Sequence, residues 1–139
     1  MIKTNQTIVC NDYGNCMQAV LSSLFEIDMD KTINPLDHGL EWNCKLKEWL
    51  LSIGYRYEGV MNACSSVEQN KMDLAFSDYS VGGFFYGVVP SKTFEDETHA
   101  IIINCEGIVV HDPNPNKAWL NINVLDTKDL IYWYQFEKI

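Results

Sequence analysis

The stretch "NDYGNCMQAVLSSLF" (residues 11–25) sets a polar, turn-forming segment directly before a cysteine and an apolar run directly after it. Asn15 is a residue type that caps helices, Gln18 stands where it completes a capping box, and Gly14 lets the chain turn in. We therefore expect Cys16 in the first turn of a helix that ends at about Glu26. The apolar residues recur at helical spacing, which predicts a buried face made of Val20, Leu21, Leu24 and Phe25.

The expected position of Cys16 favours a reactive thiol. Unpaired backbone N–H groups and the helix dipole at a helix start favour an anion, which lowers a thiol pKa. The chain has five cysteines but no Cys-x-x-Cys pair typical of a zinc or redox site, so we expect reduced thiols. Cys44, Cys64 and Cys105 are expected to be small apolar side chains, buried or half-buried. Cys16 is therefore the candidate nucleophile.

The composition limits the classes of protein to consider. A chain of 139 residues that is 47% hydrophobic suits one domain spanning residues 1–139. A net charge of -9 without a cluster of Lys or Arg argues against a nucleic-acid partner. No apolar run reaches the length of a membrane span, and the first residues lack the apolar core of a signal peptide. We expect a cytoplasmic protein with no membrane partner, no metal and no other cofactor.

The remaining sequence predicts an α+β domain. The connector "DMDKTINPLDHG" (28–39) precedes a second helix that ends near Gly54. Tryptophans at helical spacing are more typical of a core than of a ligand platform, so we expect its apolar face to be buried: Trp42, Leu46, Trp49, Leu50 and Ile53. A short helix is expected in 67–76 and strands in 55–60, 82–89, 98–104, 107–112 and 130–139. Helices first and antiparallel strands after them indicate the α+β class.

His99 and Asp112 lie at the outer ends of two of these strands, which a short turn joins. If Ile103 pairs with Ile108, His99 lies opposite Asp112 and the two side chains share a face. A tighter turn shifts the register by two residues and puts Asn114 opposite His99 instead. In the first register the face that should pack against the Cys16 helix carries Ile101, Ile103, Ile108 and Val110.

The expected parts are those of nucleophilic catalysis: a thiol at a helix start, an imidazole to take its proton, and a carboxylate or amide to orient the imidazole. Two other histidines are not expected to be the base, because His111 points to the opposite face of its strand and His38 lies in a loop. The acidic run 95–97 borders the expected site, where it could attract a basic residue of a substrate.

The order Cys, His, Asp, with the cysteine on an early helix and the other two on late strands, resembles the papain-like cysteine peptidases. "GNCMQAVLSSLFEI" (14–27) followed by "THAIIINCEGIVVHDPNPN" (98–116) is similar to small papain-like proteins of bacteria and phages. It also resembles the bacteriocin-processing peptidase domains of exporters, whose triad acid precedes a proline, as Asp112 precedes Pro113. Residues 27–80 carry no such resemblance.

The resemblance implies a papain-like fold, with the Cys16 helix packed on a C-terminal antiparallel sheet. In that family a glutamine upstream of the cysteine completes the oxyanion hole with the cysteine's backbone N–H, which assigns this role to Gln6. The family usually has the glutamine nearer the cysteine, where this chain has Cys10 and Asn11, so Asn11 is the second candidate.

The function implied is a cysteine hydrolase that cleaves a peptide, isopeptide or amide bond in a protein or peptide substrate. Cys16 would attack, His99 would act as base and then acid, and Asp112 would orient His99. One alternative is an acyltransferase, transglutaminase-like or amidotransferring, that uses the same triad and an amine in place of water. Another is a binding or inhibitory protein on a papain-like scaffold without turnover.

Overall fold

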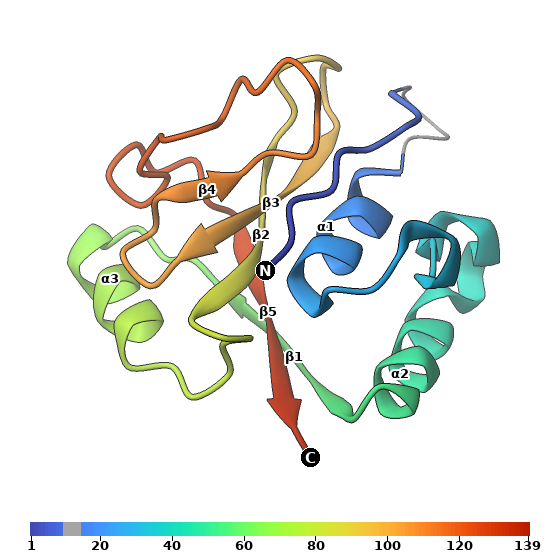
Figure 1. Cartoon of the computed structure of the whole chain (residues 1–139). Helices are drawn as coiled ribbons and strands as arrows, with labels where there is room; N and C mark the ends of the chain where they lie inside the picture. Colours follow the sequence, from blue (N-terminus) through green and yellow to red (C-terminus); the bar gives the residue numbers. More distant parts are fainter. Residues whose placement is uncertain (10–14) are drawn as a thin grey trace.

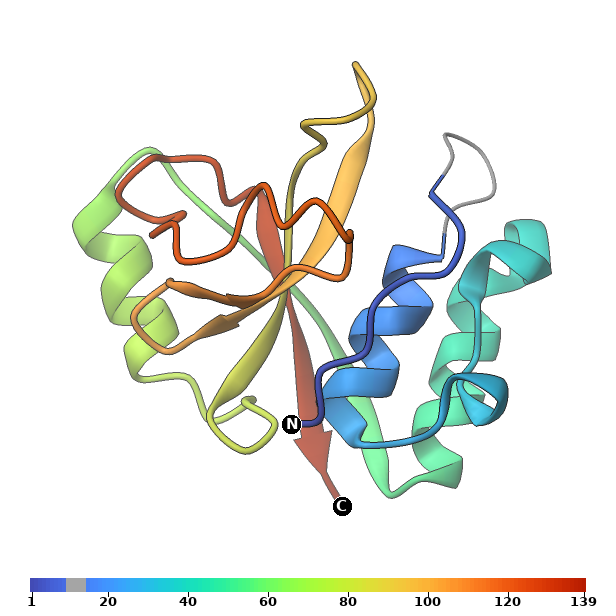
Figure 2. The ribbon, with the colours of Figure 1, turned by 45° about the horizontal axis from the view of Figure 1, so that its top comes forward.

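The computed structural model describes residues 1–9 and 15–139. Within them, two helices cover one face of an antiparallel sheet and a third helix lies on the other side (Figures 1 and 2). The helices are α1 (Cys16–Phe25), α2 (Trp42–Ser52) and α3 (Val67–Ala75), with short 3₁₀ turns η1 (Met29–Lys31) and η2 (Pro35–Glu41) between the first two. This mixture of helices and antiparallel sheet confirms the α+β class.

The sheet has five strands in the order β1-β5-β2-β3-β4, and each neighbouring pair is antiparallel. The strands are β1 (Tyr55–Asn62), β2 (Phe84–Pro90), β3 (Thr98–Asn104), β4 (Val109–His111) and β5 (Tyr132–Lys138). In the part of the chain that the structure describes, no helix is both long enough and apolar enough to cross a bilayer.

Two apolar cores lie on the two faces of the sheet. The core under α1 and α2 contains Val20, Leu21, Leu24, Leu46, Leu50, Val88, Ala100 and Ile102. The core on the α3 side contains Leu74, Phe85, Val89, Ile101, Ile103, Val109, Trp119 and Leu125. The expectation that Ile101 and Ile103 face the Cys16 helix is therefore wrong. Burial on both faces explains the error, since the run "AIIIN" has no alternation of apolar and polar residues that would tell the faces apart.

The buried face of α2 is narrower than expected. Leu46 and Leu50 are fully buried, while Trp49 and Ile53 are half-buried against the same core. Trp42 is not a core residue, because it begins α2 and is 36% exposed. Packing reaches only the later turns of this helix, so Trp42 remains at the surface.

The N-terminal segment is tied to α1 and to the chain after β4. The Ile2 N–H donates to the Ser23 carbonyl at 3.1 Å, and the Thr4 N–H donates to Ser23 Oγ at 2.7 Å. Farther along, the Gln6 N–H donates to the Pro113 carbonyl at 2.9 Å. These bonds fix the segment along α1 and beside the chain after β4. The next two residues donate their N–H groups to the Asn15 side chain, which brings Gln6 close to the start of α1.

Asn15 precedes α1 as predicted, but its side chain does not cap the helix. Its Oδ1 accepts from the N–H groups of Thr7 and Ile8 at 3.0 and 2.9 Å, and its Nδ2 donates to Gln18 Oε1 at 3.3 Å. The Gln18 amide nitrogen donates to backbone carbonyls of the η1 region, so the predicted capping box is absent. The long-range bonds satisfy the Asn15 oxygen and leave the first N–H groups of α1 without a side-chain acceptor from that residue.

The β3–β4 hairpin does not keep the register that pairs Ile103 with Ile108, and its pair Ile102–His111 falls in the two-residue-shifted register of the tighter turn. Ile103 pairs with Val109 and Ile102 with His111, with a bulge between the two pairs. The Val109 backbone bonds to the 121–122 loop instead, since its N–H donates to the Ile122 carbonyl and its carbonyl accepts from the Asn121 N–H. This non-local bonding, which a count along the hairpin does not include, produces the bulge.

Candidate functional site

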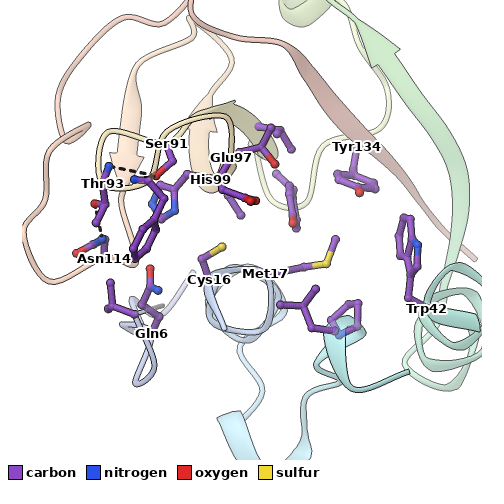
Figure 3. A pocket seen from close by; sticks show the side chains of 18 of the residues that line it. Gln6, Cys16, Met17, Trp42, Ser91, Thr93, Glu97, His99, Asn114 and Tyr134 are labelled. Carbon is purple, nitrogen blue, oxygen red and sulfur yellow. Dashed lines mark hydrogen bonds between the residues drawn. The ribbon is translucent and has the colours of Figure 1, made fainter. Parts of the chain in front are cut away.

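Cys16 and His99 meet at one end of the molecule, where α1 begins and β3 has just started (Figure 3). They line a cavity of about 490 Å³ together with Gln6 and Asn114. Asp112 follows the last residue of β4, is fully buried, and lies behind His99. The structure thus brings together all four residues that the sequence proposes for the site, although the helix packs on the other face of β3.

The predicted contact between His99 and Asp112 is present. His99 Nε2 lies 2.7 Å from Asp112 Oδ1, and both side chains are buried. Because Nε2 is engaged by the carboxylate, Nδ1 is the ring nitrogen left for the Cys16 thiol. This arrangement holds the imidazole in one orientation and stabilises its protonated form.

Backbone groups surround the Asp112 carboxylate as well. The Asn114 N–H donates to Oδ1 and the Trp119 N–H donates to Oδ2, each at 3.0 Å. Burial alone would raise the pKa of Asp112, but the bonds from His99, Trp119 and Asn114 hold that pKa below the ordinary carboxyl value. The carboxylate therefore stays ionised beside His99.

Asn114 was the alternative partner for His99. Its backbone N–H bonds to Asp112, and its side-chain amide donates to Thr93 Oγ1 at 3.5 Å. The geometry therefore favours Asp112 over Asn114 as the group that orients the imidazole.

The ionisation of Cys16 and His99 is coupled. Burial would raise the pKa of the Cys16 thiol, but the hydrogen bond and positive charge of His99, with the N–H groups of Ala100 and Met17, hold that pKa below the ordinary value. Burial would likewise lower the pKa of His99, yet its bonds to Asp112 and Cys16 raise it to about 9. Both directions favour a thiolate beside an imidazolium, which is an activated nucleophile.

Gln6 lines the cavity and is only 7% exposed. Its Nε2 donates to the Ile8 carbonyl at 2.9 Å, while Oε1 has no hydrogen-bond partner among the residues that the structure describes. An amide nitrogen carries two hydrogens, so one remains for an oxyanion at the site. Asn11, the second candidate for this role, lies outside the described residues.

We predict that Gln6→Ala lowers the rate of amide cleavage by roughly ten to a thousandfold, because it removes one donor to the developing oxyanion. The rate at which iodoacetamide alkylates Cys16 should not change, since the amide acts on the intermediate and not on the thiol. Both rates can be measured on the same preparations. Gln69→Ala, at an exposed amide on α3, is the control. A loss in Asn11→Ala but not in Gln6→Ala would refute the assignment.

Other sequence predictions have mixed outcomes. Cys44, Cys64 and Cys105 are exposed, so the expectation that they are buried or half-buried is wrong. Cys44 lies on the surface of α2, and Cys64 and Cys105 lie in segments that connect elements, a placement that residue type does not reveal. His38 is exposed in η2 as expected, and His111 Nε2 lies 2.7 Å from the Thr4 carbonyl, away from the thiol.

Two kinds of site residue were missed from the sequence. Lys117 Nζ donates to the Asp112 carbonyl at 2.6 Å and also to Asn5 Oδ1, so it links the segments that carry Asp112 and Gln6. Lys117 and Asn5 are 112 positions apart, which no local pattern reveals. The second kind is aromatic, since Tyr132 and Tyr134 of β5 line the cavity. The aromatic run "YWY" was a signal, but it was read only as a strand.

No cluster of three or more His, Cys, Asp or Glu side chains suited to a metal ion occurs within residues 1–9 and 15–139. Comparisons of the chain with models of protein families, with curated proteins and with solved structures find no match.

Proposed function

We propose that the protein is a papain-like cysteine hydrolase that cleaves a peptide, isopeptide or amide bond. The observation that carries the proposal is the chain of contacts from the half-buried Cys16 through His99 to the buried Asp112, in which the thiol pKa is lowered and the imidazole pKa is raised. A structural cysteine and a structural histidine need neither shift.

In the proposed reaction the Cys16 thiolate attacks the carbonyl carbon and forms a C–S bond, while the carbonyl π electrons move to oxygen. The Cys16 backbone N–H, at the start of α1, and the Gln6 amide donate to that oxyanion. His99 then gives its proton to the leaving nitrogen as the C–N bond breaks. The products of this half are a free amine and an acyl group on Cys16.

In the second half His99, now neutral, takes a proton from water as the water oxygen attacks the thioester. The C–S bond breaks, a carboxylic acid leaves, and the thiolate beside the imidazolium is restored. If an amine attacks in place of water, the same residues transfer the acyl group. Product analysis with and without an added amine distinguishes hydrolysis from transfer.

The test of this proposal is alkylation by iodoacetamide near neutral pH, followed by intact-mass and peptide mass spectrometry. Cys16 should react well before the other four cysteines, because its thiolate fraction is the highest. The test is stringent, since Cys44, Cys64 and Cys105 are more accessible than the half-buried Cys16.

Fast formation of the adduct should be lost in Cys16→Ala and should be slower in His99→Ala. It should be unchanged in Cys64→Ala, the matched control, which removes an exposed cysteine. Labelling of Cys16 no faster than that of Cys64 would remove the main support for a nucleophile. That result would favour the alternative in which the protein binds a partner and catalyses no reaction.

A further inference from the structure

The cavity around Cys16 has two chemically different halves (Figure 3). Gln6, Thr93 and Asn114 lie on one side of the thiol, and Met17, Trp42 and Tyr134 lie on the other. The first half carries the amide and hydroxyl groups, beside which Val9 and Phe94 also line the cavity, and the second half is aromatic and aliphatic. A substrate that spans Cys16 would therefore meet two different environments.

The proposed reaction decides which part of a substrate lies in which half. His99 must reach the leaving nitrogen to protonate it, so the leaving group lies on the His99 side of Sγ. The acyl group then extends away from His99. In this structure that direction leads along Met17 toward Trp42 and Tyr134.

Tyrosine rings form the inner wall of the acyl half. Tyr86 and Tyr134 meet edge to face with centroids 4.4 Å apart, and Tyr132 meets Tyr134 in the same manner at 5.8 Å. Tyr86 and Tyr134 are 2% and 3% exposed. Burial raises the pKa of both, so their hydroxyls stay protonated and this wall carries no charge.

The outer rim of the acyl half comes from η2 and the start of α2. Trp42 is 36% exposed and Leu36 is 56% exposed, and both line the cavity. No Lys or Arg occurs among the lining residues that the structure describes, and the only carboxylate there is that of Glu97. The positive charge of His99 is already paired with the thiolate and the carboxylate of the proposed triad, so no free cation among these described residues would compensate the desolvation of an anionic acyl group.

We propose that the acyl half of the cavity binds a bulky, uncharged apolar group, above all an aromatic side chain, next to the carbonyl that Cys16 attacks. The inference rests on the proposed function and names the class of substrate for it. Aromatic rings pack on the edges and faces of tyrosine and tryptophan side chains, and the partly exposed Trp42 offers such a ring at the rim.

The test uses the p-nitrophenyl esters of 3-phenylpropanoic, acetic and succinic acid, the last with its second carboxylate free. Acylation of Cys16 releases p-nitrophenol, and each rate is divided by the rate of the same ester with N-acetylcysteine. The normalised rate of the phenylpropanoyl ester should exceed that of the acetyl ester about tenfold or more, and the succinyl ester should be slowest. This comparison needs only the unaltered protein.

Trp42→Ala should reduce the preference for the phenylpropanoyl over the acetyl ester severalfold, because it removes the aromatic rim. Leu40→Ala is the matched control, since Leu40 is a fully exposed apolar residue near Trp42 that does not line the cavity, and its variant should keep the preference. Equal normalised rates for the three esters would overturn the inference and leave the proposed function standing. Failure of every ester to acylate Cys16 would overturn both.

Discussion

The His99→Ala variant should lose amide cleavage by roughly 10⁶-fold and remain folded, the size of effect seen when a triad base is removed. Two contributions of the imidazole disappear together. Cys16 loses the hydrogen bond and charge that lower its pKa, so that burial raises it, and the leaving nitrogen loses its proton donor. His38→Ala, at an exposed histidine in η2, should retain full activity.

Cleavage of a peptidyl aminocoumarin amide that the unaltered protein turns over measures this loss. In the unaltered protein kcat/KM should fall as the pH rises through about 9, where His99 loses the proton it must deliver. It should also fall on the acid side, as the pH drops through the lowered pKa of Cys16. A His99→Ala protein that keeps more than roughly a hundredth of the activity would contradict the triad, because removal of a general base alone costs about a hundredfold or more.

The Asp112→Ala variant should lower turnover by roughly four orders of magnitude, because an imidazole without its partner loses its orientation and tautomer. Asn114→Ala should have little effect, since Asn114 bonds Asp112 through its backbone N–H, which the substitution keeps. Turnover of the two variants, compared with thermal melts, separates the two possible partners of His99. Full activity in both would mean that His99 has no third partner on this hairpin.

A stability effect accompanies the loss in Asp112→Ala. The buried N–H groups of Asn114 and Trp119 lose their acceptor, which costs about 1–3 kcal/mol for each group. The lowered pKa of Asp112 means that its carboxylate stabilises the fold above the ordinary carboxyl pKa and ceases to do so as the pH falls through the lowered value. The difference in melting temperature between the unaltered protein and Asp112→Ala should therefore shrink in acid. The difference in their rates should persist wherever the unaltered protein is active.

The start of α1 at Cys16 was predictable from the sequence, and so were the two strands near His99 and Asp112. Helical spacing of Val20, Leu21 and Leu24 places the helix, and the apolar runs around the "CEG" turn place the hairpin. Such signals depend on residues within a few positions of one another. The contact between His99 and Asp112 was predictable for the same reason, because one short turn joins their strands.

The partners of Asn15, the hairpin bulge at Val109 and the exposure of Trp42 were decided only by the tertiary structure. Asn15 is satisfied by Thr7 and Ile8 rather than by its own helix, and Val109 bonds the 121–122 loop rather than continuing its ladder with β3. Each outcome depends on a segment that folding brings alongside. A capping residue can bond its own helix or a distant segment, a strand can pair with more than one neighbour, and a tryptophan can be buried or exposed. Sequence spacing predicts only the contacts between residues that are close in the chain. Tertiary packing decides the contacts between distant segments, and it places Gln6 and the tyrosine rings of the cavity beside Cys16.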